Sequence, residues 1–175
     1  MQLMLDMDGV ITDWVRAAHR IHGREHLLED GYPYLRGKYN WYRDDPRWAD
    51  MTLEYFWAAM GEGFWENVVE WDPSGKLRLS QAEAFFGKEN ICIVTGPPPC
   101  IQTSTAITGS VRGKWKWIAR EMPDYTNRVI FTHEKQWLAT PDRTLWDDSP
   151  NQVKKFKEAG GNVVLIKQPW NFVEM

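Results

Sequence analysis

The chain has 175 residues, a length that suits one domain or one domain with a modest insertion. Asp plus Glu number 24 and Lys plus Arg number 21, so the net charge of −3 argues against a nucleic-acid coat or a polybasic membrane anchor. Two cysteines exclude a disulfide-dense scaffold and a four-thiolate zinc site. Tryptophan is unusually frequent, with 11 copies, and composition alone does not assign these residues a role.

Five short apolar runs predict β-strands, at residues 3–7, 90–95, 128–131, 143–146 and 162–166. Three stretches between them predict helices, at residues 77–86, 114–121 and 152–159. Strands that alternate with helices indicate an α/β fold with a mainly parallel sheet. Right-handed crossovers make such a sheet doubly wound, as in Rossmann-like folds.

Residues 14–74 interrupt this alternation. They contain no clear strand, they hold six of the 11 Trp, and their acidic side chains outnumber the basic ones. We interpret them as a small helical cap inserted after the first strand, with residues 1–13 and 75–175 forming the core. The alternative is a first crossover that loops have enlarged.

The opening residues lack a basic region followed by an apolar run, and no stretch of about eighteen apolar residues occurs anywhere. We therefore expect no signal peptide, no membrane span and a cytoplasmic location.

Asp6 and Asp8 follow the first predicted strand. Residues two apart in an extended chain project to the same side, and two carboxylates that close repel each other. A divalent cation relieves this repulsion, and Mg²⁺ is typically bound by one or two carboxylates plus a substrate phosphate. Gly9 would let the backbone turn away sharply. The alternative is an ordinary Asp-Gly turn after a strand.

Other polar residues follow the later strands. Asp147 and Asp148 form a second acidic pair, which could complete a metal's coordination shell or cap the next helix. Thr95 and Gly96 end the second strand, where a hydroxyl and a backbone N–H can hold a phosphate oxygen.

Lys114 opens a predicted helix and Lys135 follows the third strand, so either could neutralise phosphate charge, although most lysines are simply solvated. A parallel sheet brings the carboxyl ends of its strands to one edge, where ligands bind. The acid pair, Thr, Lys and second acid pair together therefore indicate a ligand site at this edge more specifically than any one of them does alone.

In this order the motifs resemble the haloacid dehalogenase-like phosphohydrolase superfamily, whose pattern is Asp-x-Asp-Gly, then Thr or Ser after a strand, then Lys, then an acidic pair. More specifically, the chain resembles the 5′(3′)-deoxyribonucleotidase family. The similar stretches run from residue 3 to residue 148 in the right order and include 6–14, 64–65, 73–75, 94–97, 113–118, 131–135 and 145–148. The cap between residues 15 and 63 matches poorly.

The resemblance implies a haloacid dehalogenase-like fold and a Mg²⁺-dependent phosphomonoesterase. Its small-molecule substrates would be nucleoside monophosphates, hydrolysed through an aspartyl-phosphate intermediate. Asp6 would be the nucleophile and Asp8 the general acid and base. The implied metal ligands are Asp6, Asp8 through its backbone carbonyl, Asp147 and Asp148. The implied phosphate ligands are Thr95, Gly96, Lys114 and Lys135.

Three departures from the family pattern bear on the substrate. Gly96 replaces a serine, so only a backbone N–H remains there to face the phosphate. His133 replaces an arginine, so a fixed charge becomes a titratable one. Residues 97–112, rich in proline and then in Ser and Thr, look divergent and are expected to form a loop.

In the proposed cap, Trp14 and Trp65 are the candidates for contact with a nucleobase, while most other aromatics are expected to form the cap's own core. An acidic cap suits a mononucleotide better than a nucleic-acid polymer. The alternatives are a phosphatase for another small phosphate or for nucleic-acid 3′-phosphate ends, and a non-catalytic binding protein on the same fold.

His19, His22 and His26 fall on roughly one helical face, which we expect to be solvated rather than a metal site. Cys92 is expected to be an inert buried thiol. Cys100, in the expected loop, has no evident partner.

Overall fold

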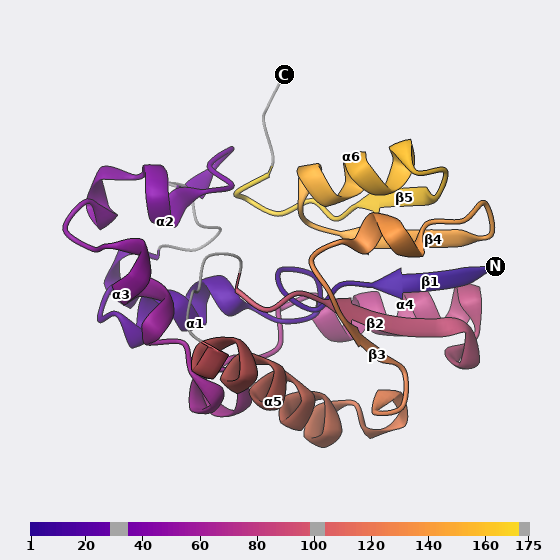
Figure 1. Ribbon diagram of the computed structural model, residues 1–175, viewed down its shortest axis with the longest axis horizontal. Coiled ribbons are helices and arrows are strands. Elements are labelled where there is room, and N and C mark those ends of the chain that lie inside the picture. The colour runs from indigo at the N-terminus through magenta and orange to yellow at the C-terminus, as the bar shows by residue number, and fades with distance from the viewer. Residues whose placement is uncertain (29–34, 99–103, 172–175) are drawn as a thin grey trace.

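The computed structural model describes residues 1–28, 35–98 and 104–171 and contains one five-stranded parallel sheet, ordered β3-β2-β1-β4-β5 (Figure 1). All five predicted strands are confirmed. Their bounds are β1 (Gln2–Leu5), β2 (Ile91–Thr95), β3 (Val129–Phe131), β4 (Arg143–Asp147) and β5 (Asn162–Leu165).

The strand order places β1 at the centre of the sheet. Leu3 pairs with Ile91 of β2 on one side and with Thr144 of β4 on the other. The chain builds outward from β1 through β2 to β3 and then returns to the opposite side for β4 and β5. The direction of winding therefore reverses between β1 and β4, and in open α/β sheets ligands bind beyond the carboxyl ends of the strands at such a point.

Helices cover both faces of the sheet, which confirms the doubly wound α/β fold. Leu3 and Leu5 pack with residues of α4 (Gly75–Phe86) and α5 (Ser104–Glu121) in one buried cluster. Met4, which points to the other face as the strand period requires, packs with Phe156 of α6 (Pro150–Glu158). The helices predicted at 77–86 and 152–159 correspond to α4 and α6.

Helix α5 begins at Ser104, so the expected loop over residues 97–112 is wrong for 104–112, and so is the expected helix start at Lys114. Residues 99–103, including Cys100, lie outside the described residues. Local composition favoured a loop, because glycine, serine and threonine are poor helix formers. Tertiary packing nevertheless favours the helix, because its glycines allow a close approach to residues 61–65. A Cβ at Gly113 would lie 2.4 Å from the Glu62 carbonyl oxygen and 2.7 Å from the Trp65 Cβ. The small residues let α5 pack closely on residues 61–65.

Residues 14–28 and 35–74 form helical turns beyond the carboxyl ends of the strands and contain no strand (Figure 1). The α-helices are α1 (Trp14–Ile21), α2 (Trp41–Asp44) and α3 (Leu53–Ala58), and Phe64–Val68 is a π-helix. This helical segment has its own buried cluster, separate from the two clusters on the sheet. We name it the aromatic cluster after its buried rings, which are Trp41, Trp48, Phe56, Trp57, Phe64, Trp65 and, from the C-terminal part of the chain, Trp170.

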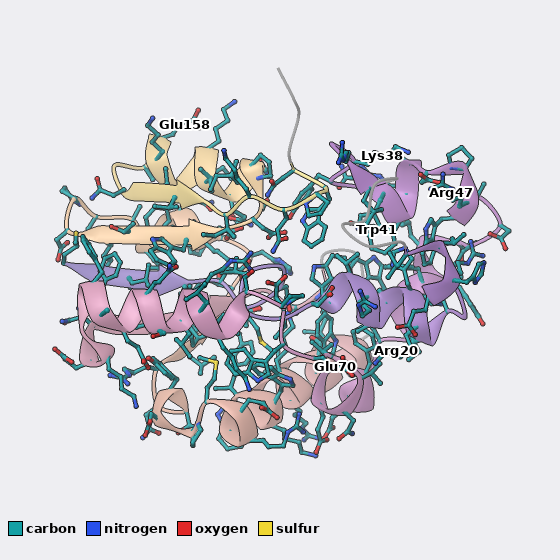
Figure 2. The ribbon with its side chains drawn as sticks, turned by 180° about the vertical axis from the view of Figure 1, so that it is seen from behind. Arg20, Lys38, Trp41, Arg47, Glu70 and Glu158 are labelled. Atoms are coloured by element: carbon teal, nitrogen blue, oxygen red, sulfur yellow. The ribbon has the colours of Figure 1, made fainter. Side chains whose placement is uncertain are left out.

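Charged residues surround the aromatic cluster on the surface of the helical segment. Figure 2 places Trp41 inside this segment, with Lys38 and Arg47 near its periphery. Arg20 pairs with Glu70 at 2.9 Å, and this exposed pair links the two ends of the segment. Such exposed pairs contribute little to stability, so the buried rings hold the segment together.

His19 and His22 do not lie on the expected solvated face, whereas His26 is exposed. His19 is fully buried against Trp41 and Trp48, and its Nδ1 lies 2.7 Å from the Val15 carbonyl oxygen. Burial lowers the pKa of His19 to about 4, so the ring is neutral at neutral pH. His22 stacks on Phe56 with 5.0 Å between ring centroids. Both rings therefore belong to the packing of the helical segment.

Within the described ranges, none of the helices has both the length and the apolar character that a membrane crossing requires.

Candidate active site

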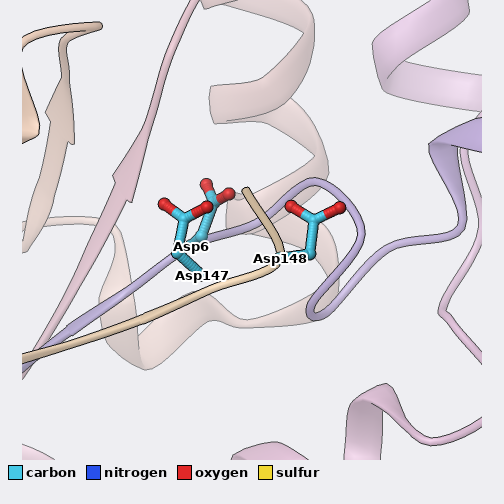
Figure 3. Close-up of side chains that lie close together, drawn as sticks. All are labelled: Asp6, Asp147 and Asp148. Carbon is cyan, nitrogen blue, oxygen red and sulfur yellow. The ribbon is translucent and has the colours of Figure 1, made fainter. Parts of the chain in front are cut away.

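Three carboxylates meet where the sheet reverses its winding. Asp6 follows β1, Asp147 ends β4, and Asp148 comes directly after it. One oxygen from each residue lies within 4.8 Å of an oxygen from both others, and all three side chains are buried. Figure 3 shows the three carboxyl groups directed to the same side. The structure therefore brings together three of the four predicted metal ligands through their side chains.

The local backbone explains how the three carboxylates approach one another. Gly9 has φ +73° and turns the chain after β1, as its Asp-Gly motif indicated. A Cβ at Gly9 would lie 2.4 Å from Asp148 Oδ2, so a side chain there would displace this carboxylate. Ser149 caps α6 by accepting from the Gln152 N–H, and its own N–H donates to Asp147 Oδ1 at 2.8 Å.

Lys135 lies inside this cluster instead of facing solvent. Its ammonium group is 2.8 Å from Asp6 Oδ1 and 2.7 Å from Asp147 Oδ2. Although burial opposes the charged form, the two carboxylates raise the pKa of Lys135 above its usual range. The lysine is therefore a permanent cation that offsets part of the negative charge of the cluster.

The cluster carries more negative charge than Lys135 offsets, and burial disfavours that charge. Burial, opposed by Lys135 and reinforced by the charges of Asp147 and Asp8, raises the pKa of Asp6 to about 7. Burial and the charge of Asp147 likewise raise the pKa of Asp148. A divalent cation among these oxygens would favour the ionised forms. Three buried hard-oxygen donors fit Mg²⁺, which prefers carboxylate ligands.

Asp8 faces a second cluster rather than the first. Its Oδ2 accepts hydrogen bonds from the Lys114 ammonium and, at 3.3 Å, from the Thr95 hydroxyl. Lys114 also donates to Thr95 Oγ1 at 3.0 Å and to the Gly96 carbonyl oxygen at 2.6 Å. The Lys114 ammonium lies 4.2 Å from the centre of the Trp65 ring. Asp8, Thr95, Gly96 and Lys114, which the sequence placed together, thus meet from β1, β2 and α5.

A cavity of about 260 Å³ opens over both clusters. Its floor includes the carboxylates of Asp6 and Asp148 and the Lys114 ammonium. The aromatic part of its lining comes from the helical segment and the C-terminal part of the chain, with Trp14, Tyr39, Tyr42, Trp57, Trp65 and Trp170. Trp14 and Trp65, the two predicted base-contact residues, both line the cavity. A largely aromatic lining with a few polar groups is typical of small-molecule sites.

Sequence reasoning missed Trp170. Its indole N–H donates to Asp148 Oδ2 at 2.6 Å, and its ring belongs to the aromatic cluster. Asn171 also holds Asp148, because its side-chain amide donates to the Asp148 carbonyl oxygen at 2.6 Å. These residues follow the last strand and resemble no motif. The sequence offers only the polar-aromatic run Gln168-Pro169-Trp170-Asn171 after the last predicted strand as a signal.

Comparison with known proteins yields structural likenesses only. No family model matches the chain, and no curated protein matches it. A HAD family enzyme from Bacteroides thetaiotaomicron, solved in complex with magnesium and inorganic phosphate, aligns over 95% of this chain and 94% of its own, with 16% identity and a TM-score of 0.46. A hydrolase from Pseudomonas syringae aligns over 94% of this chain and 82% of its own, with 12% identity and a TM-score of 0.45. Site assignments for the present chain must therefore come from its own geometry.

Proposed function

We propose that this protein is a Mg²⁺-dependent phosphomonoesterase that hydrolyses nucleoside monophosphates through an aspartyl-phosphate intermediate. The observation that carries the proposal is the cavity floor, where three buried carboxylates lie beside the pair formed by Asp8 and Lys114. A cation-binding cluster next to a buried lysine is what a doubly negative phosphate group requires.

In the proposed reaction, Asp6 attacks phosphorus and the bond to the leaving alkoxide breaks. Asp6, Asp147 and Asp148 would hold Mg²⁺, which offsets the repulsion between the carboxylate and the phosphate and stabilises charge in the transition state. Lys135 keeps Asp6 oriented through its 2.8 Å contact with Oδ1. Lys114 neutralises the phosphoryl oxygens from the other side.

Asp8 would move the protons. It would protonate the leaving alkoxide and then remove a proton from the water that hydrolyses the intermediate, so that free phosphate is released and Asp6 is regenerated. Its Oδ1 is buried and has no partner within the described part of the chain, whereas Oδ2 accepts from Lys114 and Thr95 in a side chain that is 21% exposed. Oδ2 would therefore be the oxygen that exchanges the proton.

The helical segment would act as a cap that selects the substrate. Trp14 is partly buried and lies nearly parallel to Trp57, with 6.2 Å between ring centroids and 17° between planes. Both rings line the cavity that holds the carboxylates, and the partly buried Trp14 offers a flat surface for a base whose phosphate lies on the floor. Stacking of one base on one aromatic ring contributes about 1–3 kcal/mol.

A phosphate-release screen with Mg²⁺ tests the proposal. The compounds are nucleoside monophosphates, sugar phosphates, glycerol phosphate and a 3′-phosphorylated oligonucleotide. We expect nucleoside monophosphates to be the best substrates. Preference for the oligonucleotide or a sugar phosphate would overturn the substrate assignment, and no release by folded protein would overturn the enzyme assignment.

A variant separates base recognition from phosphate chemistry. Trp14→Ala should raise KM for a nucleoside monophosphate about tenfold, because it removes one stacking surface, and leave KM for glycerol phosphate unchanged. Tyr55→Ala, which removes an exposed ring of the same segment, is the matched control and should change neither value. Equal effects of Trp14→Ala on both substrates would contradict a role in base recognition.

A further inference from the structure

The ring of His133 fills the space beside Gly96. A Cβ at position 96 would lie 2.7 Å from Nδ1 and 2.9 Å from Cε1 of this ring, closer than van der Waals contact allows. Gly96 does not have a positive φ, so space rather than backbone conformation requires glycine here. Position 96 therefore cannot carry a side chain while the imidazole keeps its place.

The same imidazole faces the cavity. His133 follows β3, is half-buried, and lines the cavity together with Lys114 and Asp8. Its backbone carbonyl accepts a hydrogen bond from Gln152 Nε2 at 2.9 Å. Across the residues that the structure describes, neither ring nitrogen has a hydrogen-bond partner. A polar ring at the cavity surface thus has its hydrogen-bonding capacity unused.

The charges around the ring keep it neutral. Burial, Lys114 and Lys135 lower the pKa of His133, while Glu134 acts in the opposite direction. A neutral imidazole carries one N–H donor and one acceptor nitrogen. It can therefore bind an anion's oxygen without placing a third positive charge beside the two lysines.

The other phosphate-binding groups expected from the sequence leave this position open. Thr95 is fully buried, and its hydroxyl is already engaged with Asp8 and Lys114. Gly96 has no side chain. His133 is thus a side chain from the β3 loop that can direct a hydrogen-bond donor onto this part of the cavity floor, beside Thr132, whose hydroxyl accepts from the Glu134 N–H.

We propose that His133 is a substrate-binding residue whose imidazole N–H donates to a phosphoryl oxygen, from the volume that a side chain at position 96 would otherwise fill. The inference rests on the proposed function, since it names the group that holds the phosphate of the substrate. Gly96 and His133 then form one unit, in which the missing side chain of the first makes room for the ring of the second.

Binding of inorganic phosphate tests the inference most directly. Calorimetry with Mg²⁺ present gives its Kd, and phosphate-release assays on the best substrate of the screen give KM and kcat. His133→Leu should raise both Kd and KM about tenfold, with a smaller change in kcat, because it removes one hydrogen bond to a charged oxygen. His133→Gln, which restores an N–H donor, should recover part of the loss. His26→Leu changes an exposed histidine far from the cavity floor and serves as the control.

A double-mutant cycle tests the link between the two residues. Gly96→Ser alone should displace the ring and weaken phosphate binding. In the His133→Ala background the ring is already absent, so adding Gly96→Ser should cost little further phosphate affinity. Should Gly96→Ser fail to fold, His133→Leu and His133→Gln decide the question.

The outcomes separate this inference from the proposed function. Wild-type Kd and KM in His133→Leu, or a folded Gly96→Ser change that costs as much phosphate affinity in the His133→Ala background as it does alone, would overturn the role of His133 while wild-type activity upholds the enzyme. A folded wild-type protein that neither binds nor releases phosphate would overturn both.

Discussion

The sheet edge and the aromatic cluster bury polar groups in opposite ways. At the sheet edge, Lys135 lies between Asp6 and Asp147, and Lys114 is held by Asp8 and Thr95. In the aromatic cluster, the buried indole N–H groups of Trp41, Trp48 and Trp57 have no partner within the described residues. Directed contacts between charged groups determine how the side chains are arranged at the sheet edge. In the aromatic cluster, the shapes of large rings determine this arrangement.

This difference predicts how each region responds to substitution. A buried charge that loses its partner is costly, so the sheet edge should tolerate almost no change. Ring packing is worth more than the unpaired indole N–H groups cost, so the aromatic cluster should respond mainly through stability and substrate choice. The following variants test this contrast, beginning with the largest expected effect.

Asp6→Asn should abolish phosphate release, with kcat at least about 10⁴-fold lower, because it removes the proposed nucleophile. The loss of one partner of Lys135 is offset by relief of repulsion among the three carboxylates, and Lys135 keeps Asp147, so the variant should remain folded. Asp142→Asn, at an exposed aspartate, is the matched control and should retain activity. Wild-type turnover by folded Asp6→Asn protein would refute the assignment of the nucleophile.

Lys114→Met should lower kcat about 10²- to 10³-fold, as expected for the loss of one charge-stabilising donor. The same change at Lys116, two positions along α5, removes an exposed lysine paired with Glu62 and Glu66. Steady-state kinetics should show near-normal rates for Lys116→Met. Similar losses in both variants would mean that α5, not the Lys114 ammonium, is what matters.

Acid should weaken the aromatic cluster through His19. Its pKa is about 4 in the folded protein against about 6.5 in the unfolded chain, so the unfolded state binds the additional proton. The stability that this group contributes is complete above pH 6.5 and is lost as the pH falls toward 4. At pH 5 the loss is about 2 kcal/mol, or about thirtyfold in the folding equilibrium.

Urea unfolding at pH 7 and pH 5 measures this loss. His19→Phe removes the titrating ring and should reduce the difference between the two pH values by about 2 kcal/mol. His26→Gln, at an exposed histidine, should leave the difference as in the wild type. An unchanged pH dependence in His19→Phe would assign the effect to other groups.

Trp170→Phe tests the residue that contacts both the sheet edge and the aromatic cluster. It keeps a ring in the aromatic cluster but loses the 2.6 Å hydrogen bond to Asp148. Removing the partner of a metal-binding side chain typically weakens metal affinity about 10- to 100-fold, so the Mg²⁺ concentration for half-maximal activity should rise about tenfold. The rise in melting temperature on adding Mg²⁺ should also become smaller. Trp137→Phe, at a ring that is 81% exposed, should leave both values unchanged.

Much of the sheet could be predicted because each strand is a short apolar run in a regular alternation with helices. The approach of Asp6 to Asp147 followed from the same pattern, since the carboxyl ends of β1 and β4 share one edge. The start of α5 could not be predicted, because its poor helix formers are stabilised by close packing on residues 61–65. The place of His19 was missed for a similar reason, since periodicity does not reveal what covers a helical face.

The site residues likewise divide into those that the sequence could predict and those that it could not. Asp6, Asp8 and Lys114 stand in motifs that chemistry makes recognisable in sequence. Trp170 reaches the site only because the chain returns to the sheet edge after β5, and the fit of His133 against Gly96 depends on a contact between two loops. Such contacts arise from tertiary structure and leave no spacing pattern.

The central position of β1 also has a consequence for folding kinetics. Because Leu3 pairs with both Ile91 and Thr144, the first strand is completed only by segments that emerge much later in the chain. Closing such long loops costs entropy before any contact repays it, which makes parallel sheets of this kind slow to fold. Asp6 and Asp147 meet only when β4 has docked, so a folding intermediate that lacks β4 has no assembled carboxylate cluster. Recovery of phosphate release during refolding should therefore coincide with formation of the complete sheet.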